Sequence, residues 1–383
     1  MKKILIVVNI PKFFVSHWLD IAHAAKAEGY EVHIATSSGA DVAIIKNAGF
    51  IHHTIALERS SKNIIKEFKC IVDLIKLFRN VQPDLVHLIT IKPVIYGGIA
   101  AKFSGVGAIL SAVTGLGYVF INTSSKKFTL AQIVRQLYKS AFSHKNIKVV
   151  FENEADQETF VTTGLIPDAR TTVIHGAGVR LQEYKYVQEP EDNLTVTFAA
   201  RLLKDKGIIE FLEATKVVKA VRKVKFKVVG DIDPDNPASI TQQELDTFKS
   251  VYDVEFCGFR TDIAKIFSES NIVVLPSYRE GLPKVLIEAA SCGRAVITTD
   301  VPGCRHVILP DRTGLLVPVR DSKSLAEAML KLIDDGELRK RMGTNGRKLA
   351  EEKFADTHIA KSYLNSYQSL IVEQENQKRK YKA

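Results

Sequence analysis

The sequence has 383 residues, of which 46% are hydrophobic and 25% charged, and its formal net charge is +10. A chain of this length is expected to form about two domains, with enough apolar content to fill both cores. Four cysteines (Cys70, Cys257, Cys292 and Cys304) show neither a CxxC pair nor a Cys/His spacing, which argues against a cysteine-based metal site and indicates reduced thiols of a cytoplasmic protein.

The positive charge is concentrated in the first half of the chain. Between Arg59 and Lys148 there are 14 basic residues, opposed only by Glu67, Asp73 and Asp84. Such a surface favours a polyanionic partner: anionic lipid headgroups, a diphosphate or nucleic acid. The alternative is a solvated basic face without a partner.

Short apolar runs alternate with amphipathic stretches through the first half of the chain. The apolar core of Met1–Pro11 is too short for a signal peptide and predicts a buried strand. Strands are expected at Ile4–Val8, Glu31–Thr36, Ile51–Leu57, Leu85–Ile89, Ala108–Val113, Lys148–Phe151 and Thr172–Ile174. Helices are expected at Phe14–Glu28, Ile64–Arg79, Tyr96–Phe103, Leu130–Phe142 and Asp156–Thr163. Phe103–Ser125 is uncharged and long enough to span a bilayer, but its four glycines favour a buried strand and a loop.

The second half repeats this alternation. Strands are expected at Thr195–Ala199, Lys225–Val229, Val254–Phe256, Asn271–Leu275 and Ala295–Thr299, and helices at Ile208–Val221, Thr241–Ser250, Asp262–Ser268 and Lys284–Ser291, before a largely helical tail. The pattern predicts two doubly wound, Rossmann-like α/β domains that face each other across a cleft at the carboxyl ends of their strands. The polar segment Leu181–Asn193 predicts the linker. The expected parts are 1–187, 188–360 and a C-terminal helix over 361–383 that packs back on the N-terminal domain and ends in a basic tail.

The stretch Pro276–Gly303 reads as a strand end, a turn, a helix and a second strand. Gly281-Leu282-Pro283 comes at the helix start, where backbone N–H groups lack intrahelical partners and can cradle an anion. Glu280 and Glu288 flank this start about two helical turns apart, so that both carboxylates can address one cleft.

The spacing of Glu280 and Glu288 resembles the signature of glycosyltransferase family 4, whose members have the GT-B fold. Further motifs follow in the family's order: Arg201 with Lys206-Gly207, Val229-Gly230-Asp231, Cys257-Gly258-Phe259-Arg260 and Thr313–Pro318. The N-terminal half is similar more loosely to a subgroup that builds bacterial surface polysaccharides. This similarity rests on Asp84–His87, Thr90–Pro93, Tyr96-Gly97 and Thr114–Tyr118.

Transfer from a nucleoside diphosphate sugar requires stabilisation of the leaving diphosphate. Arg201 can fork onto phosphate oxygens, Lys206 adds a point charge and the helix start near Gly281 adds N–H donors, so no metal is required. A surface salt-bridge role is the alternative for both cations. The resemblance implies that Glu288 holds the ribose, that Glu280 contacts the donor sugar and that the anomeric configuration is retained. The expected donor-binding residues are Arg201, Lys206, Gly230, Arg260, Glu280, Gly281, Leu282, Pro283 and Glu288.

The N-terminal half supplies candidates for acceptor chemistry. The expected catalytic residues are Glu280, Arg201, Lys206 and His17. Among them His17, near the start of the first expected helix, is a candidate base or an acceptor-binding group. Lys92 and Tyr118 are expected to contact the acceptor. His87 lies in a strand and is interpreted as a structural histidine.

Alternating aspartates at Asp231, Asp233 and Asp235 raise the question of a metal. A calcium loop needs glycine and glutamate where this chain has Asn236 and Gln242, so a hydrogen-bonded loop is expected. The chain also lacks a Walker A or dinucleotide fingerprint, which argues against ATP or NAD as a cofactor.

The expected function is therefore a retaining glycosyltransferase that moves a hexose or N-acetylhexosamine from a UDP-sugar without a cofactor. The resemblance implies an undecaprenyl-type lipid diphosphate acceptor in O-antigen, capsule or glycan assembly. The basic stretch with its aromatics predicts a cytoplasmic protein peripherally associated with the inner membrane. Two alternatives stay open: a GT-B-like nucleotide-sugar epimerase or sugar phosphorylase, and a basic nucleic-acid-binding protein, which is disfavoured because no recognition motif accompanies the charge. The donor sugar, the linkage and the oligomeric state are not specified.

Overall fold

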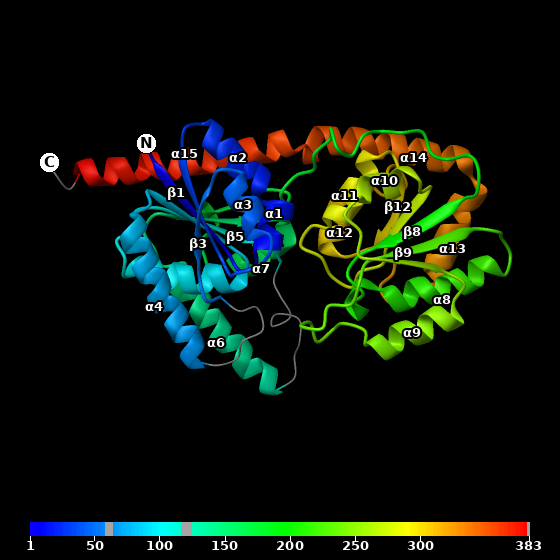
Figure 1. The fold of residues 1–383 in the computed structure, drawn as a ribbon, viewed down its shortest axis with the longest axis horizontal. Helices are drawn as coiled ribbons and strands as arrows, with labels where there is room; N and C mark the ends of the chain where they lie inside the picture. The colour runs from blue at the N-terminus through cyan, green and yellow to red at the C-terminus, as the bar shows by residue number, and fades with distance from the viewer. Residues whose placement is uncertain (58–63, 116–124, 381–383) are drawn as a thin grey trace. The chain divides into compact units, whose positions relative to one another are not determined.

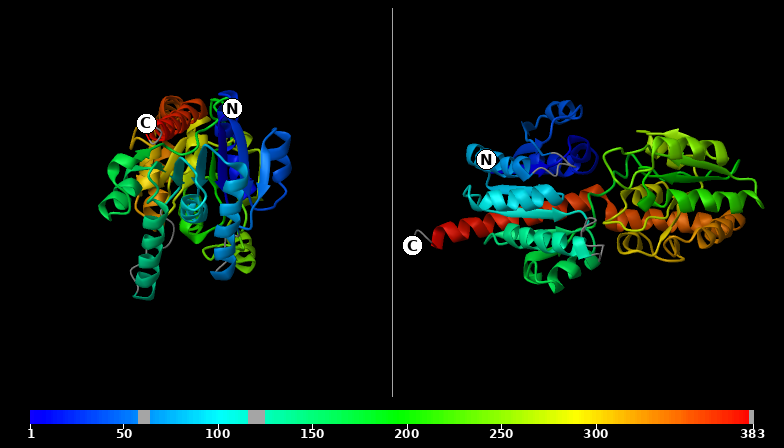
Figure 2. Two further views of the ribbon diagram at one scale, coloured as in Figure 1. Left: turned by 90° about the vertical axis from the view of Figure 1, so that its left-hand side faces the viewer. Right: turned by 90° about the horizontal axis from the view of Figure 1, so that it is seen from below.

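The structure is a computed structural model that describes residues 1–57, 64–115 and 125–380. The chain divides into two compact units, one formed by Met1–Ala177 with Asp356–Ala383 and one by Gly178–Ala355 (Figure 1). The segment Leu181–Asn193, expected as a linker, thus belongs to the C-terminal unit. Each unit is an α/β layer structure with helices on both faces of its sheet (Figure 2), which confirms the expected fold class.

The sheet of the N-terminal unit consists, among the described residues, of seven parallel strands in the order β3-β2-β1-β4-β5-β6-β7. Its centre is apolar because both faces are covered: every residue from Ile4 to Val8 is fully buried. The strands are β1 (Lys3–Val8), β2 (Glu31–Thr36), β3 (Ile51–Thr54), β4 (Leu85–Ile89), β5 (Ile109–Val113), β6 (Ile147–Phe151) and β7 (Thr171–Val173). The expected buried strand within Phe103–Ser125 is β5, and residues 116–124 lie outside the described part.

The helices of this unit include the C-terminal helix α15, which packs along α2 and against β4, β5 and β6. Figure 1 shows it as the long red helix beside β1 and α2. The helices are α1 (Pro11–His17), α2 (Leu19–Ala27), α3 (Val42–Asn47), α4 (Ile64–Val81), the π-helix η1 (Pro93–Gly97), α5 (Gly98–Lys102), α6 (Ser125–Ala141), α7 (Glu154–Thr162), the short 3-10 turn η3 (Asp168–Arg170) and α15 (Asp356–Lys380).

The prediction of a single helix over Phe14–Glu28 is wrong, because the helix is interrupted at Trp18 and divides into α1 and α2. Trp18 has φ −118° and ψ −7°, and its indole is buried edge-to-face against His87 and Tyr363. Burial of this large side chain outweighs the local preference for an unbroken helix. The sequence also gave no indication of the short helix α3.

The C-terminal unit has, among the described residues, six parallel strands in the order β10-β9-β8-β11-β12-β13. The strands are β8 (Thr195–Ala199), β9 (Lys225–Val229), β10 (Glu255–Gly258), β11 (Ile272–Leu275), β12 (Ala295–Thr299) and β13 (Gly314–Val317). The helical elements are η4 (Lys204–Lys206), α8 (Ile208–Lys219), α9 (Gln242–Val251), α10 (Ile263–Ser268), α11 (Lys284–Ser291), α12 (Pro302–Val307), α13 (Ser322–Asp334), α14 (Gly336–Leu349) and η5 (Ala350–Phe354). Because β8 and β11 are neighbours, the loops after them lie side by side.

No helix in the described ranges combines the length and the apolar run that a membrane span requires.

Candidate functional site

The loops after β8 and β11 bring together Lys206 and Glu280, which the sequence analysis names as donor-binding residues. Nζ of Lys206 lies 2.5 Å from Oε1 of Glu280, and the Oγ of Ser277 donates to the same oxygen at 2.6 Å. The Lys206 side chain is 20% exposed and that of Glu280 is 10% exposed. A partly desolvated cation and carboxylate therefore stand in contact at the carboxyl edge of the sheet.

Glycine allows this close approach of the two loops. Gly207 has φ +76°, and a Cβ there would lie 2.2 Å from the carbonyl oxygen of Pro276, which immediately follows β11. The same holds in the neighbouring loop, where Gly230 has φ +141° and a Cβ would lie 1.8 Å from the carbonyl oxygen of Ala200. The positions of Arg201 and Lys206 thus depend on backbone contacts that only glycine permits.

Arg201, on the loop after β8, forms an ion pair with an aspartate of the loop after β9. Its Nη1 lies 2.5 Å from Oδ2 of Asp233, and its side chain is about half exposed. One of the alternating aspartates, Asp233, is therefore the ion-pair partner of Arg201. Burial raises the pKa of the Asp205 carboxyl, and the nearby charges of Lys206 and Arg201 offset part of this rise. Both cations are therefore close enough to influence the same carboxyl group.

Glu288 lies on α11, one turn after Lys284. Its carboxylate is 3.6 Å from Nζ of Lys284 and its side chain is 12% exposed. Burial raises the pKa of Glu288, while Lys284 and the hydroxyl of Tyr184 act in the opposite direction. The carboxylate is thus placed where an added hydroxyl donor would stabilise its charged form.

The helix start near Glu280 is built as the sequence indicated. Pro283 is the N-cap of α11, and among the described residues no side chain caps this end. The carbonyl oxygens of Glu280 and Gly281 each lie 2.4 Å from where a Cβ of Gly303 would be, so the first turn of α12 packs closely against this loop. Leu282, half-buried, packs against the hydrophobic core of the unit. Backbone N–H groups of a helix N-terminus can bind an anion at this point.

Arg260, beyond the end of β10, is placed differently. It is exposed and makes a bidentate ion pair with Asp262, with distances of 2.8 and 2.6 Å. The preceding residue, Phe259, is 57% exposed. A planar nucleotide base can stack on an exposed aromatic ring that lies beside a guanidinium group.

The N-terminal candidates lie in the other unit. His17 is the last residue of α1 rather than near its start, and its Nδ1 is 2.7 Å from the Oγ of Ser16. Lys92 forms an ion pair with Oε1 of Glu67 at 2.7 Å. Tyr118 lies outside the described residues.

His87 is a core histidine, as expected. It is fully buried in β4, and its Nδ1 is 2.8 Å from the hydroxyl of Tyr367 on α15. Burial lowers its pKa to about 3. The histidine is therefore neutral near pH 7 and belongs to the packing of α15 on the sheet.

Family models match both halves of the chain. Residues 181–349 match the model described as "Glycosyl transferases group 1", and residues 3–153 match "Glycosyl transferase 4-like". The first of these matches includes the loops that carry Arg201, Lys206 and Glu280 and the helix α11 that carries Glu288. The chain belongs to glycosyltransferase family 4. The expectation of a transferase, as opposed to an epimerase or a nucleic-acid-binding protein, is confirmed.

Several curated relatives of this glycosyltransferase are bacterial transferases. An N,N'-diacetylbacillosaminyl-diphospho-undecaprenol alpha-1,3-N-acetylgalactosaminyltransferase of Campylobacter jejuni is 29% identical, over 82% of this chain and 84% of that protein. The capsular polysaccharide biosynthesis glycosyltransferase CapM of Staphylococcus aureus is 26% identical, over 91% and 93%. A UDP-Gal:alpha-D-GlcNAc-diphosphoundecaprenol alpha-1,3-galactosyltransferase of Escherichia coli is 26% identical, over 71% and 72%.

Solved structures support the GT-B fold of the glycosyltransferase. A sucrose-phosphate synthase from Thermosynechococcus elongatus matches with a TM-score of 0.79 at 19% identity, covering 97% of this chain and all of that one. Anabaena Alr3699/HepE in complex with UDP matches with a TM-score of 0.76 at 17% identity, covering 96% and 100%.

Three side chains of the glycosyltransferase site were not singled out from the sequence. Ser277 lies inside the quoted stretch but carried no signal beyond its place there. Asp233 was expected in a hydrogen-bonded loop and not as a metal ligand, but its partner was not named, although its position after a strand adjacent to β8 could have suggested Arg201. Tyr184 lies in the polar segment taken for a linker, where nothing in the pattern indicates an influence on the pKa of Glu288.

Proposed function

We propose that this glycosyltransferase moves a hexose or N-acetylhexosamine from a UDP-sugar to a sugar carried on an undecaprenyl-type lipid diphosphate. The transfer retains the anomeric configuration, needs no metal and serves O-antigen, capsule or other surface-glycan assembly. The observation that carries the donor assignment is the pairing of Lys206 with Glu280 beside the N-terminus of α11. The cation and the helix N–H groups suit a diphosphate, and the adjacent carboxylate suits the hydroxyls of a sugar attached to it.

Each donor residue has a proposed role. Lys206 and Arg201 neutralise the diphosphate as charge develops on it, and the N-terminus of α11 adds hydrogen bonds. Glu280 accepts hydrogen bonds from hydroxyls of the donor sugar, and Glu288 accepts them from the ribose. Gly230, Gly281, Leu282 and Pro283 shape the backbone around these groups, and Arg260 lies beside the base.

The proposed acceptor and donor rest on the named relatives. The Campylobacter jejuni and Escherichia coli enzymes carry diphospho-undecaprenol acceptors in their names, and the latter also names a UDP-sugar. A GT-B structure that shares the fold holds UDP. Lys92, Tyr118 and His17 are the proposed acceptor-side groups, with His17 as a candidate base.

An assay of UDP release tests the function. Purified enzyme is incubated with single UDP-sugars, with and without a synthetic lipid-diphosphate-linked N-acetylhexosamine, and with excess chelator in a parallel series. We expect UDP release that requires the acceptor, persists in chelator and gives a product whose anomeric proton reports retention. Interconversion of UDP-sugars without release, phosphate-dependent release, or loss of activity in chelator would each contradict part of the proposal.

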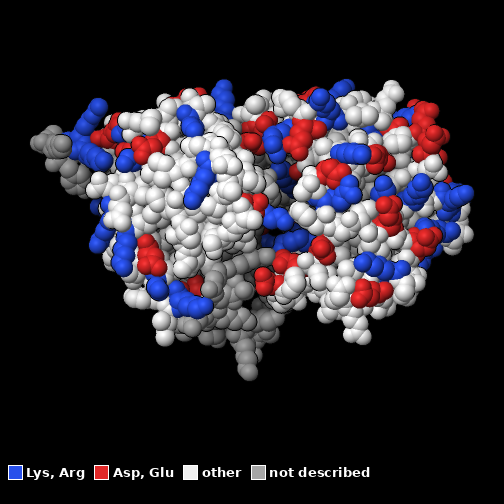
Figure 3. Space-filling view, in the orientation of Figure 1, with Lys and Arg blue, Asp and Glu red and all other residues white. Residues whose placement is uncertain are grey.

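Association with the cytoplasmic face of the inner membrane is also proposed. Helix α4 exposes Ile65 by 80% and Phe68 by 67%, and Lys66 and Lys69 lie beside them in sequence. Figure 3 shows several Lys and Arg side chains, in blue, over the region of α4. Apolar side chains that insert next to lysines suit an anionic lipid surface.

Sedimentation with vesicles tests this association. At low salt the enzyme should co-sediment with vesicles that contain anionic phospholipid, and the Ile65→Ser/Phe68→Ser variant should co-sediment several-fold less. Val251→Ser is the matched control, because Val251 is 57% exposed on α9 of the other unit. Absence of sedimentation with any vesicle would refute the membrane assignment. Equal sedimentation of all three proteins would refute the part given to Ile65 and Phe68, and either result leaves the donor assignment intact.

A further inference from the structure

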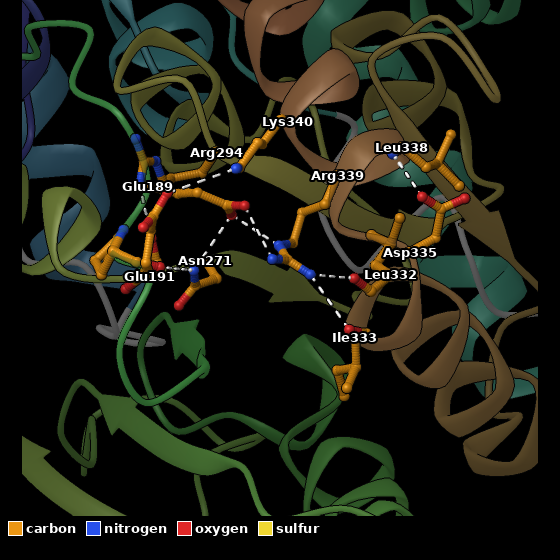
Figure 4. Close-up of polar contacts among 12 residues, drawn as sticks. Glu189, Glu191, Asn271, Arg294, Leu332, Ile333, Asp335, Leu338, Arg339 and Lys340 are labelled. Carbon is orange, nitrogen blue, oxygen red and sulfur yellow. Dashed lines mark hydrogen bonds and ion pairs between the residues drawn. The ribbon is translucent and has the colours of Figure 1, made fainter.

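Buried arginines of the C-terminal unit fasten the segment that was expected as a linker. The guanidinium of Arg339 makes two hydrogen bonds to the carboxylate of Glu189, at 2.7 and 2.9 Å, and Asn271, just before β11, donates to the same carboxylate at 3.2 Å (Figure 4). Two further arginines donate to backbone carbonyl oxygens of this segment: Arg294 to Val187 and Arg347 to Tyr184. These groups satisfy one another, so the role of this network is to hold the segment in place.

A second polar network of this unit lies beyond the carboxyl end of β11 and centres on Tyr278, two residues before Glu280. The backbone N–H of Tyr278 donates to the carbonyl oxygen of Asp205, the neighbour of Lys206, at 2.8 Å. The hydroxyl of Tyr278 donates to Oε1 of Glu210 at 2.6 Å, and Glu210 lies in the first turn of α8. Both the backbone and the side chain of Tyr278 are thus bonded to the segment that contains Lys206.

The ring and the hydroxyl of Tyr278 are held in one place. The guanidinium carbon of Arg320, shortly after β13, lies 4.6 Å from the centroid of the ring, which is a cation–π contact. Burial and the Glu210 carboxylate raise the pKa of the hydroxyl to about 12, so it is a hydrogen-bond donor near pH 7. The second carboxylate oxygen of Glu210 is shielded from solvent and has no hydrogen-bond partner within the described ranges. Loss of the hydroxyl would therefore deprive a shielded carboxylate of the hydrogen bond that it accepts.

The residue before Tyr278 ties the same loop to the neighbouring strand. Oγ1 of Thr299, the last residue of β12, donates to the carbonyl oxygen of Ser277. The Oγ of Ser277 in turn donates to Oε1 of Glu280 at 2.6 Å, the oxygen that also contacts Nζ of Lys206. The loop thus presents Glu280 from a backbone that is fixed at two consecutive residues, and Tyr278 joins this backbone to the segment of Lys206.

We infer that Tyr278 is a positioning residue that sets the distance between Lys206 and Glu280, with Glu210 as the anchor of its hydroxyl. This inference rests on the proposed function, in which Lys206 acts on the leaving diphosphate and Glu280 on the donor sugar. Transfer needs both groups in place at once, because a displacement of about 1 Å in a catalytic group can lower the rate about a hundredfold. A loop released from α8 would shift Glu280 relative to the sugar, whereas UDP, which lacks this sugar, would bind as before.

Kinetics and nucleotide binding separate this role from a structural one. In the assay of UDP release, Tyr278→Phe should lower kcat about tenfold. The dissociation constant of UDP, measured by calorimetry on the same full-length protein, should stay within about twofold of the wild type, which also shows that the variant is folded.

Variants of the anchor supply a second measurement. Glu210→Leu should lower kcat as much as Tyr278→Phe does, and the double variant should fall no further, because both changes remove the same hydrogen bond. Glu210→Gln keeps an acceptor oxygen for the hydroxyl and should stay within about threefold of the wild type.

Helix α8 offers a matched control one turn later. The hydroxyl of Tyr252 donates to Oε1 of Glu213, and Nζ of Lys216 lies 4.4 Å from the centroid of the Tyr252 ring. This group repeats the tyrosine, glutamate and cation of the Tyr278 network, but Tyr252 is the C-cap of α9 and is not part of the loop after β11. Tyr252→Phe should therefore leave kcat and the affinity for UDP unchanged.

The possible results lead to different conclusions. A kcat of Tyr278→Phe close to that of the wild type, or a loss of UDP affinity as large as the loss of kcat, overturns the inference and leaves the proposed function standing. Additive losses in the double variant would show that Tyr278 and Glu210 act separately, which also overturns it. A wild-type enzyme that releases no UDP with any donor and acceptor contradicts the proposed function itself.

Discussion

Lys206 and Glu280 form an ion pair with 2.5 Å between Nζ and Oε1, although they belong to loops after two different strands. Their side chains are largely shielded, so each neutralises the other in a setting of reduced dielectric constant. Removal of either charge leaves the other uncompensated, and this makes the pair a sensitive point for mutation.

Replacement of the lysine should reduce transfer strongly. Lys206→Met removes the point charge proposed to act on the leaving diphosphate, and we expect kcat/KM to fall by about 10²- to 10³-fold. Lys204→Met is the matched control, because Lys204 lies on the same turn but pairs with Glu244 at 2.7 Å on the surface. It should stay within about twofold of the wild type. Steady-state assays of UDP release give the comparison, and activity of Lys206→Met within a few-fold of the wild type would exclude the proposed role.

The glycine after Lys206 should be intolerant of a side chain. Gly207→Ala combines a positive φ with a Cβ only 2.2 Å from the Pro276 carbonyl oxygen. We expect the free energy of unfolding to fall by about 2–3 kcal/mol, with loss of UDP affinity as the loop moves. Gly258→Ala is the comparison for stability. Gly258 also has a positive φ of +65°, but nothing lies within 4 Å of its Cβ position, so a loss of about 1 kcal/mol is expected. Similar losses in both variants in denaturant titrations would show that the contact with Pro276 matters little.

The sequence was sufficient for the parts of the fold that depend on local pattern. Buried parallel strands such as β1 and β8 were expected almost to the residue, because both faces are covered and their apolar runs are continuous. The spacing of Glu280 and Glu288 likewise follows from one strand, one turn and one helix. The helix break at Trp18 could not be predicted in this way, because it depends on the packing of the indole against His87 and Tyr363. Burial there overrides helix propensity.

The candidate site shows the same division between local and non-local information. Lys206 and Gly207 were singled out from a short motif, but the partner of Arg201, Asp233, comes from the loop of another strand. Tyr184 was missed because a polar segment looks like a linker whether or not arginines fasten it. Those arginines are more than one hundred residues later in the chain, and no local periodicity reports such a contact.

The buried ion pair between Glu189 and Arg339 should contribute measurably to stability. Glu189→Gln removes one charge and leaves Arg339 buried without its counter-ion, so we expect a loss of about 3 kcal/mol in the free energy of unfolding. Glu191→Gln is the control on the same segment, since its 3.8 Å contact with Lys340 is exposed. It should cost less than about 0.5 kcal/mol. Denaturant unfolding followed by circular dichroism measures both. A cost for Glu189→Gln as small as that of the control would mean that the guanidinium is satisfied by carbonyl oxygens alone.

The pH dependence of stability in the N-terminal unit should depend on His87. Its pKa is about 3 in the folded protein because it is fully buried, compared with about 6.5 in an unfolded chain. Between these values the unfolded state binds the proton and the folded state does not. The free energy of unfolding should therefore fall as pH decreases from about 6.5 towards 3, by up to about 1.4 kcal/mol per pH unit from this residue.

His87→Gln should remove that part of the slope. The variant should lose some stability at pH 7, since the hydrogen bond between His87 and Tyr367 changes, but its curve between pH 6.5 and pH 4.5 should be flatter than that of the wild type. Trp18 is the only tryptophan of the chain, and its ring centroid lies 5.2 Å from that of His87, so its fluorescence reports unfolding at this location. Other titrating groups contribute equally to both proteins and cancel in the difference. Parallel curves for the two proteins would mean that His87 takes up its proton without unfolding, through local opening of α15 from the sheet.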